Sequence, residues 1–124
     1  MADVLYYGER PSRGARVYRA DGLKTVPLDP RTDLRNHSPT GLEWGYRGSG
    51  PSQLALALLA DATGDARRAL TSYNRFMELV TARLTKERWC LTRESVLLTL
   101  ESIESEERVN TSDLPQAPPE GGNP

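Results

Sequence analysis

The segment from residue 41 to residue 61, GLEWGYRGSGPSQLALALLAD, constrains the fold more than any other part of the sequence. Four glycines fall within ten residues, and a run of leucines and alanines follows them. In a helix that begins at Pro51, apolar side chains occupy almost the whole circumference, which is typical of a buried helix. Proline suits this position because its missing N–H has no partner there. We therefore expect a central helix that ends at Gly64, with either Gly50 as its N-cap or a local cap by Ser49 or Ser52.

The segments after this helix predict two more helices. Apolar side chains recur every three or four positions from Asp65 to Leu84, which indicates an amphipathic helix antiparallel to the first. A connector over residues 85–90 follows, with Trp89 and Cys90 expected in the core. Thr92 is suited to cap a third helix, whose acidic C-terminal end opposes the helix dipole and is expected to fray.

The first third of the chain has the pattern of β-structure. Residues 3–10 contain a short β-prone run, and Asp21-Gly22 is typical of the two central residues of a hairpin turn. Residues 42–44 are expected to form a further short strand. On the hairpin we expect Val17 to be buried and three charged side chains to face water: Arg16, Arg19 and Lys24. The sequence therefore predicts an α+β fold, in which a small antiparallel N-terminal sheet of two or three strands packs on three helices.

The length of 124 residues is enough for one domain with its own hydrophobic core. We place that domain at residues 1–108 and expect a disordered tail at residues 109–124, which are rich in proline, glycine and polar side chains. The formal net charge of −1 argues against a general nucleic-acid-binding protein, because such proteins usually carry a basic excess.

The cysteine count and the lengths of the apolar runs indicate the cellular compartment. A chain with one cysteine cannot form an internal disulfide, which fits a reducing compartment. The longest apolar run, Leu54 to Ala60, is too short to span a membrane, and the N-terminus lacks the pattern of a signal peptide. We expect a soluble cytoplasmic protein with no membrane partner, and the sequence leaves its oligomeric state open.

The glycine-rich turn has two interpretations. A glycine-rich loop before a helix can hold an anion on its backbone N–H groups, and such a ligand site would consist of Arg47, Gly48, Ser49, Gly50 and Ser52. The loop lacks the Gly-Lys-Ser/Thr end of a P-loop, however, and Pro51 removes one donor. We therefore favour a tight structural turn, anchored by the rings of Trp44 and Tyr46, and keep small-ligand or nucleotide-phosphate binding as the alternative.

The residue pattern gives little support for a catalytic site or a metal site. His37 is the only histidine, and Asp33 and Ser38 nearby suggest a catalytic triad. Ser38 precedes a proline and lacks the glycine-rich elbow that presents a nucleophilic serine. One histidine and one distant cysteine also give no transition-metal site. We therefore expect no catalytic residue, no metal and no cofactor.

The longest motifs of the chain are NHSPTGLEWGYRGSGPSQLALALLAD at residues 36–61, TGDARRALTSYNRFMELVTARL at residues 63–84, and a Trp-x-Leu-Thr sequence at residues 89–92. On these motifs the chain resembles a small uncharacterised family of unknown function that is found in phages, plasmids and bacteria. The resemblance covers about residues 5–103 and is most specific at Trp-Gly-Tyr-x-Gly-Ser-Gly-Pro. It implies a mobile-element context and supplies no catalytic residue.

This context favours an accessory protein that binds a host or phage protein, and that inhibits or modulates a host machine such as a defence complex, a nuclease or a polymerase. Exposed tyrosine and arginine side chains suit the centre of a protein interface. We expect the partner surface on the hairpin and on the loop at residues 29–41, and it would use Arg16, Tyr18, Arg19, Arg35 and His37. The rivals are the ligand site at the glycine-rich turn and an enzyme built around His37, Ser38 and Trp44.

Overall fold

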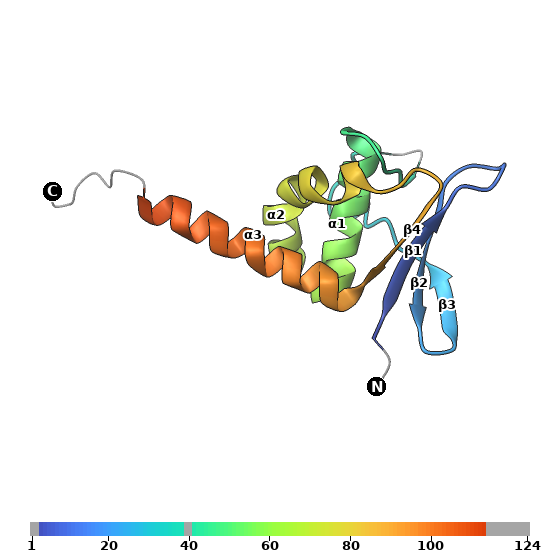
Figure 1. Cartoon of the computed structure of the whole chain (residues 1–124), viewed down its shortest axis with the longest axis horizontal. Coiled ribbons are helices and arrows are strands. Elements are labelled where there is room, and N and C mark those ends of the chain that lie inside the picture. The colour runs from blue at the N-terminus through green and yellow to red at the C-terminus, as the bar shows by residue number, and fades with distance from the viewer. Residues whose placement is uncertain (1–2, 39–40, 114–124) are drawn as a thin grey trace, which may run out of the picture.

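A computed structural model of the protein describes residues 3–38 and 41–113. It shows a four-stranded antiparallel sheet with three α-helices on one of its faces (Figure 1). The elements follow in the order β1 (Leu5–Glu9), β2 (Arg16–Asp21), β3 (Lys24–Pro27), α1 (Ser49–Thr63), α2 (Ala66–Leu79), a short 3₁₀ helix η1 (Thr81–Arg83), β4 (Arg88–Thr92) and α3 (Arg93–Asp113). The predicted α+β class and the three helices are confirmed.

The sheet differs from the prediction in its number of strands and in their origin. Its order is β3-β2-β1-β4, so that the fourth strand comes from the segment expected to be a connector. Residues 42–44, expected to form a strand, lie outside the sheet. The Trp44 indole is instead fully buried and donates to the backbone carbonyls of Thr85 and Lys86 at 3.1 and 2.9 Å. These bonds hold the segment 42–44 against the approach to β4.

The hairpin of β2 and β3 forms as predicted, with its turn one residue later. Asp21 pairs with Lys24, so the two central positions are Gly22 and Leu23. Gly22 has a φ of 63°, and a glycine at the first central position is typical of a type II′ turn. Val17 is buried as expected.

Arg19 was expected to face water, but the structure does not place it on the open side of the sheet. It pairs with Tyr6 across the sheet and shares the face that the helices cover. A carboxylate on α1, Asp61, meets its guanidinium there at 2.8 Å. This acidic partner lies far along the chain from Arg19, so local alternation of side chains did not reveal it.

The core helix α1 is buried along most of its length. All seven residues from Leu54 to Ala60 are at most 2 % exposed. The helix begins at Ser49, with Gly48 rather than Gly50 as the N-cap, and Gly64 ends it with a φ of 67°. α2 runs antiparallel to α1 and begins at its N-cap Asp65, whose side chain accepts the backbone N–H of Arg68. α2 ends before the predicted Leu84, and η1 replaces its expected last turn.

The last helix is longer than predicted. α3 continues to Asp113, past the domain boundary expected at residue 108, and its C-terminal half projects from the body on the side away from the sheet (Figure 1). Glutamates in this half are paired across to α2, since Glu104 meets Arg68 and Glu106 meets Arg75. These ion pairs offset the unfavourable position of acidic residues at a helix C-terminus. The rest of the expected tail, residues 114–124, lies outside the described residues.

Candidate functional site

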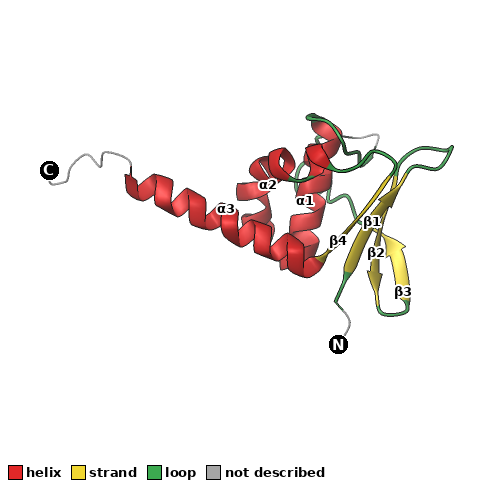
Figure 2. Ribbon diagram, viewed as in Figure 1, coloured by secondary structure: helices red, strands yellow, loops and turns green. Residues whose placement is uncertain are grey.

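The sheet has one face that the helices leave uncovered (Figure 2). The strand registers place Cys90, Tyr7, Tyr18 and Pro27 side by side in one row across this face. The rings of Tyr7 and Tyr18 lie with their centroids 5.3 Å apart. Leu5, in the neighbouring row, is 39 % exposed. An aromatic and apolar stripe therefore runs across an open surface.

A charged row borders this stripe at the end where β1 leads into its loop. It consists of Arg88, Glu9 and Arg16, and both arginines are exposed. The row carries one more positive than negative charge. We call the whole surface the outer face and define it by Leu5, Tyr7, Glu9, Arg16, Tyr18, Pro27, Arg88 and Cys90.

Cys90 was expected to be an inert core residue, and this prediction is wrong. Its side chain is exposed on the outer face. The neighbours Trp89 and Leu91 point into the core instead, because successive side chains of a strand alternate between the two faces.

The five predicted partner-binding residues do not share one surface. Arg16 and Tyr18 lie on the outer face, whereas Arg19 lies on the opposite face of the same strand. Arg35 is exposed in the loop before α1, and His37 is half-buried there with its Nε2 atom 2.7 Å from the hydroxyl of Tyr73 on α2. The structure therefore brings only Arg16 and Tyr18 together.

A polar cluster joins the covered face of the sheet to α1. The carboxylate of Asp61 accepts the hydroxyl of Tyr6 at 2.7 Å and the guanidinium Nε of Arg19 at 2.8 Å through the same oxygen. Burial raises the pKa of Tyr6 far above its usual value, and the hydrogen bond to Asp61 raises the pKa further. The tyrosine therefore stays protonated and ties β1 and β2 to the helix.

The loop before α1 is held by a buried amide. Gln53 is fully buried, and its side-chain oxygen accepts the backbone N–H groups of His37 and Ser38 at 2.7 and 3.3 Å. Its amide nitrogen donates to the carbonyl of Pro30 at 2.6 Å.

Burial of the His37 side chain lowers the pKa of its imidazole, and the positive charge of Arg35 lowers this pKa further.

The three residues that suggested a catalytic triad each have a separate partner. The Ser38 hydroxyl donates to the carbonyl of Gly41 at 2.6 Å, and the His37 ring meets Tyr73. The Asp33 carboxylate accepts two bonds from Arg31 at 3.0 and 3.1 Å. The chain of hydrogen bonds from nucleophile to base to acid that a triad requires does not join them.

The glycines of the turn before α1 are explained by close packing. A Cβ atom on Gly48 would lie 2.8 Å from the Tyr46 ring, and one on Gly50 would lie 2.5 Å from the Cβ of Glu43. Ser52 is buried, Ser49 is exposed, and Arg47 forms an ion pair with Glu78 at 2.6 Å. Close packing therefore explains both glycines, and no bound anion is needed to explain them.

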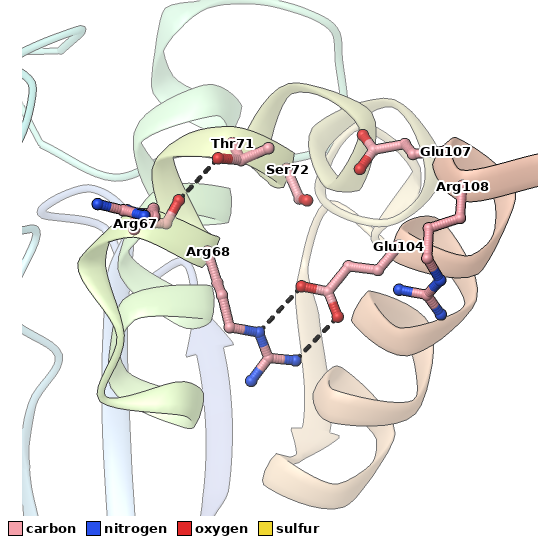
Figure 3. A pocket seen from close by; sticks show the side chains of 7 residues that line it. All are labelled: Arg67, Arg68, Thr71, Ser72, Glu104, Glu107 and Arg108. Carbon is pink, nitrogen blue, oxygen red and sulfur yellow. Dashed lines mark hydrogen bonds and ion pairs between the residues drawn. The ribbon is translucent and has the colours of Figure 1, made fainter. Parts of the chain in front are cut away.

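A hollow of about 620 Å³ lies between α2 and α3 (Figure 3). Arg68 crosses it and binds Glu104 through two bonds of 2.9 Å. Ser72 also lines the hollow, and its buried hydroxyl has no hydrogen-bond partner among the described residues. The charged groups that span this hollow are therefore already paired with each other.

A second hollow of about 340 Å³ lies where the turn before α1 meets the end of α2 and η1. We call it the arginine pocket, and its lining consists of Tyr46, Arg47, Arg75, Glu78, Ala82 and Arg83. The sequence indicated Arg47 as a ligand-site residue but missed Arg83. The antiparallel helix pair was predicted, and it could have suggested that the end of α2 lies near the start of α1.

Within residues 3–38 and 41–113, no group of three or more His, Cys, Asp or Glu side chains is placed to hold a metal ion. None of the helices in this part of the chain is both long enough and apolar enough to cross a membrane.

Comparison with protein families gives one match. The model of the "Family of unknown function (DUF6166)" matches residues 6–102, and the chain therefore belongs to this family. The matched range includes the whole sheet except Leu5, and it includes α1, α2 and the first half of α3. No curated protein and no solved structure gives a significant match to the chain.

Proposed function

We propose that this protein is an interaction module and that its partner protein binds the outer face. The observation that carries the proposal is the tyrosine pair, Tyr7 and Tyr18, which lies with Leu5 on a sheet face that none of the described helices covers. Contiguous exposed apolar surface often marks an interaction site, and tyrosine is enriched among the residues that dominate binding energy.

The charges of the outer face indicate the chemistry of the partner. Arg16 and Arg88 are exposed beside the aromatic stripe, with Glu9 between them. A complementary surface has an apolar centre and an acidic rim at the end that meets the arginines. From the mobile-element context that the sequence motifs imply, we propose a host or phage protein in the cytoplasm as the partner, and inhibition or modulation of that partner as the role.

The test is affinity capture from host lysate with matched variants. Tyr7→Thr/Tyr18→Thr removes both rings and keeps β-branched side chains that suit a strand. We expect the wild-type protein to retain one stoichiometric partner at moderate salt and this double variant to lose it. The matched control, Arg67→Gln, alters an exposed side chain on α2 and should retain the partner.

The same experiment can contradict the proposal. The outer face is rejected as a docking surface if the double variant retains the partner. It is also rejected if the wild-type protein captures no stoichiometric protein. Circular dichroism and thermal unfolding of each variant show whether a loss of binding is a loss of fold.

A specific observation also favours the second candidate function, the binding of a small anionic ligand. Three arginine side chains line one hollow beside the turn before α1.

A further inference from the structure

The arginine pocket is built from three segments of the chain. Tyr46 and Arg47 come from the turn before α1, Arg75 comes from the last turns of α2, and Arg83 comes from η1. The helix pair is antiparallel, so the end of α2 lies beside the start of α1. The pocket is therefore a surface hollow built by three segments of the fold and not a feature of one loop.

The pocket carries more positive than negative charge. Its three guanidinium groups face a single lining carboxylate, that of Glu78. One oxygen of Glu78 lies 2.6 Å from Arg47, and the other lies 3.4 Å from Arg75. Arg83 donates its Nε to the backbone carbonyl of Glu78 at 3.0 Å, so it neutralises no carboxylate through this bond. Arg75 reaches one further carboxylate, Glu106 on α3, at 3.5 Å.

Hydrogen-bond donors also exceed acceptors in the pocket. Each guanidinium offers five N–H donors, whereas a carboxylate accepts about four hydrogen bonds. Each arginine makes one contact with Glu78, and these contacts use few of the donors. Arginine presents its donors as a rigid planar fork that matches a phosphate group, and a fork that is already positioned loses less entropy on binding.

The start of α1 adds to the positive field beside the pocket. Its N-cap, Gly48, supplies no side-chain cap, and no acidic residue lies in the first turn of the helix. The helix itself therefore supplies no capping or acidic side chain that would offset the positive end of its dipole. The helix dipole adds to the positive potential of the arginines, but it does not by itself define the site.

Tyr46 gives the pocket an apolar wall. Its ring lies against Gly48, where a Cβ would be 2.8 Å from a ring carbon, and its hydroxyl lies near Gly50, where a Cβ would be 3.0 Å from the oxygen. The residue is still 45 % exposed. An aromatic ring that is supported from beneath and open to solvent is suited to stack on a planar ligand ring.

We propose that the arginine pocket binds a nucleoside monophosphate. The phosphate lies among Arg47, Arg75 and Arg83, and the base stacks on Tyr46. The volume of about 340 Å³ is near the lower limit for ligand pockets, which suits one nucleotide and not a polymer. This inference extends the second candidate function and is independent of the outer face.

The test is isothermal titration of the full chain with AMP, adenosine and inorganic phosphate. We expect AMP to bind on the order of tenfold more tightly than inorganic phosphate, because only AMP also stacks on the ring. Arg83→Gln and Arg75→Gln should each weaken AMP binding by about tenfold or more, and Tyr46→Leu should reduce AMP to the affinity of inorganic phosphate. The matched control is Arg67→Gln, an exposed arginine of the same helix outside the pocket, which should leave the affinity unchanged.

Three results would overturn the proposal. They are no heat of binding with AMP at millimolar concentration, equal affinity of wild type for AMP and inorganic phosphate, and equal weakening by Arg67→Gln and Arg83→Gln. Thermal unfolding without ligand shows whether a variant has kept its fold. The Tyr7→Thr/Tyr18→Thr variant should bind AMP normally, so failure of the outer-face proposal and failure of this one remain distinguishable.

Discussion

The side-chain oxygen of Gln53 lies 2.7 Å from the backbone nitrogen of His37, and through this bond the buried helix α1 holds the loop that precedes it. The same side chain also bonds Ser38 and Pro30, so a single amide satisfies three backbone groups. The loop contains no helix or strand up to Ser38, and these bonds fix its path.

Replacement of Gln53 by methionine should therefore be costly although the volume changes little. Two N–H groups and one carbonyl would lose their partner, and we expect the free energy of unfolding to fall by about 3 kcal/mol. Urea denaturation measures this change. The control is Leu56→Met, a fully buried and volume-conserving substitution in the same helix, which should cost less than about 1.5 kcal/mol. Equal costs for the two variants would contradict the role of Gln53.

Gly8 and Trp89 should be energetically coupled. The Trp89 indole lies across Gly8 on the neighbouring strand, and a Cβ on Gly8 would overlap its ring atoms. The indole also packs edge-on against Trp44 at 5.6 Å, so it has little room to move. We expect Gly8→Ala to cost about 2 kcal/mol in wild type and clearly less in a Trp89→Leu background. A double-mutant cycle measures the coupling, and additive costs would reject it.

Removal of two buried hydroxyls should have different effects on stability. The Ser72 hydroxyl has no partner among the described residues, whereas Thr81 donates to the carbonyl of Pro51 at 2.8 Å. Ser72→Ala should leave stability unchanged or raise it by up to about 1 kcal/mol, since alanine also suits a helix better. Thr81→Val should lower stability by about 1–2 kcal/mol. A substantial loss of stability in Ser72→Ala would show that its hydroxyl is satisfied.

The hydroxyl of Tyr6 should contribute to stability through Asp61. Tyr6→Phe leaves the Asp61 carboxylate with Arg19 but removes a 2.7 Å bond at a buried site. We expect a loss of about 2 kcal/mol at pH 7 by thermal or urea unfolding. Tyr7→Phe, the matched change on the outer face, should cost less than half as much. Comparable losses would show that the bond to Asp61 contributes little.

His37 should make the protein less stable in mild acid. Its pKa is lowered in the folded state below the usual 6.5, so the unfolded chain binds the proton more tightly. The stability is fully present above pH 6.5 and is lost as the pH falls through the folded-state pKa. Between pH 6.5 and pH 5, wild type should therefore lose more stability than His37→Gln, as measured by urea unfolding across this range. Parallel pH profiles would contradict the shift.

Stability should continue to fall at lower pH, but for another reason. Arg68 holds the pKa of Glu104 below its usual 4.5, so the ion pair between α2 and α3 is lost only in stronger acid. Loss of stability in that lower range belongs to carboxylates and should be unaffected by His37→Gln.

Much of the fold could be predicted from local pattern. The continuous apolar surface of residues 54–60 identified the core helix, and Gly64 marked its end. Asp21-Gly22 identified the hairpin, although the turn begins one residue later than predicted. In these cases the physical cause lies within a few neighbouring residues.

The errors arose where the cause lies far along the chain. β4 was missed because five residues with an arginine at one end give little signal, although Trp89 and Leu91 alternate with Cys90 as a strand requires. The position of Arg19 depends on Asp61.

The candidate sites were also only partly visible in the sequence. The outer face joins β1 to β4, and the arginine pocket joins residues 46–47 to residues 75–83. Tyr18, Arg16 and Arg47 were identified as candidates, but the side chains that surround them come from segments that meet only in the folded molecule. Spacing along the chain cannot show such neighbours.

The position of β1 between β2 and β4 has a consequence for the order in which the protein folds. β1 can pair with β2 through a short loop, but its other partner is separated from it by both the hairpin and the helix pair. Contacts between distant segments carry a larger entropic cost of loop closure and form later than local ones. We therefore expect the hairpin and the helix pair to form early and β4 to be added in a late step. Until that step, β1 is a sheet edge open to other chains, and the risk of aggregation is greatest in this interval.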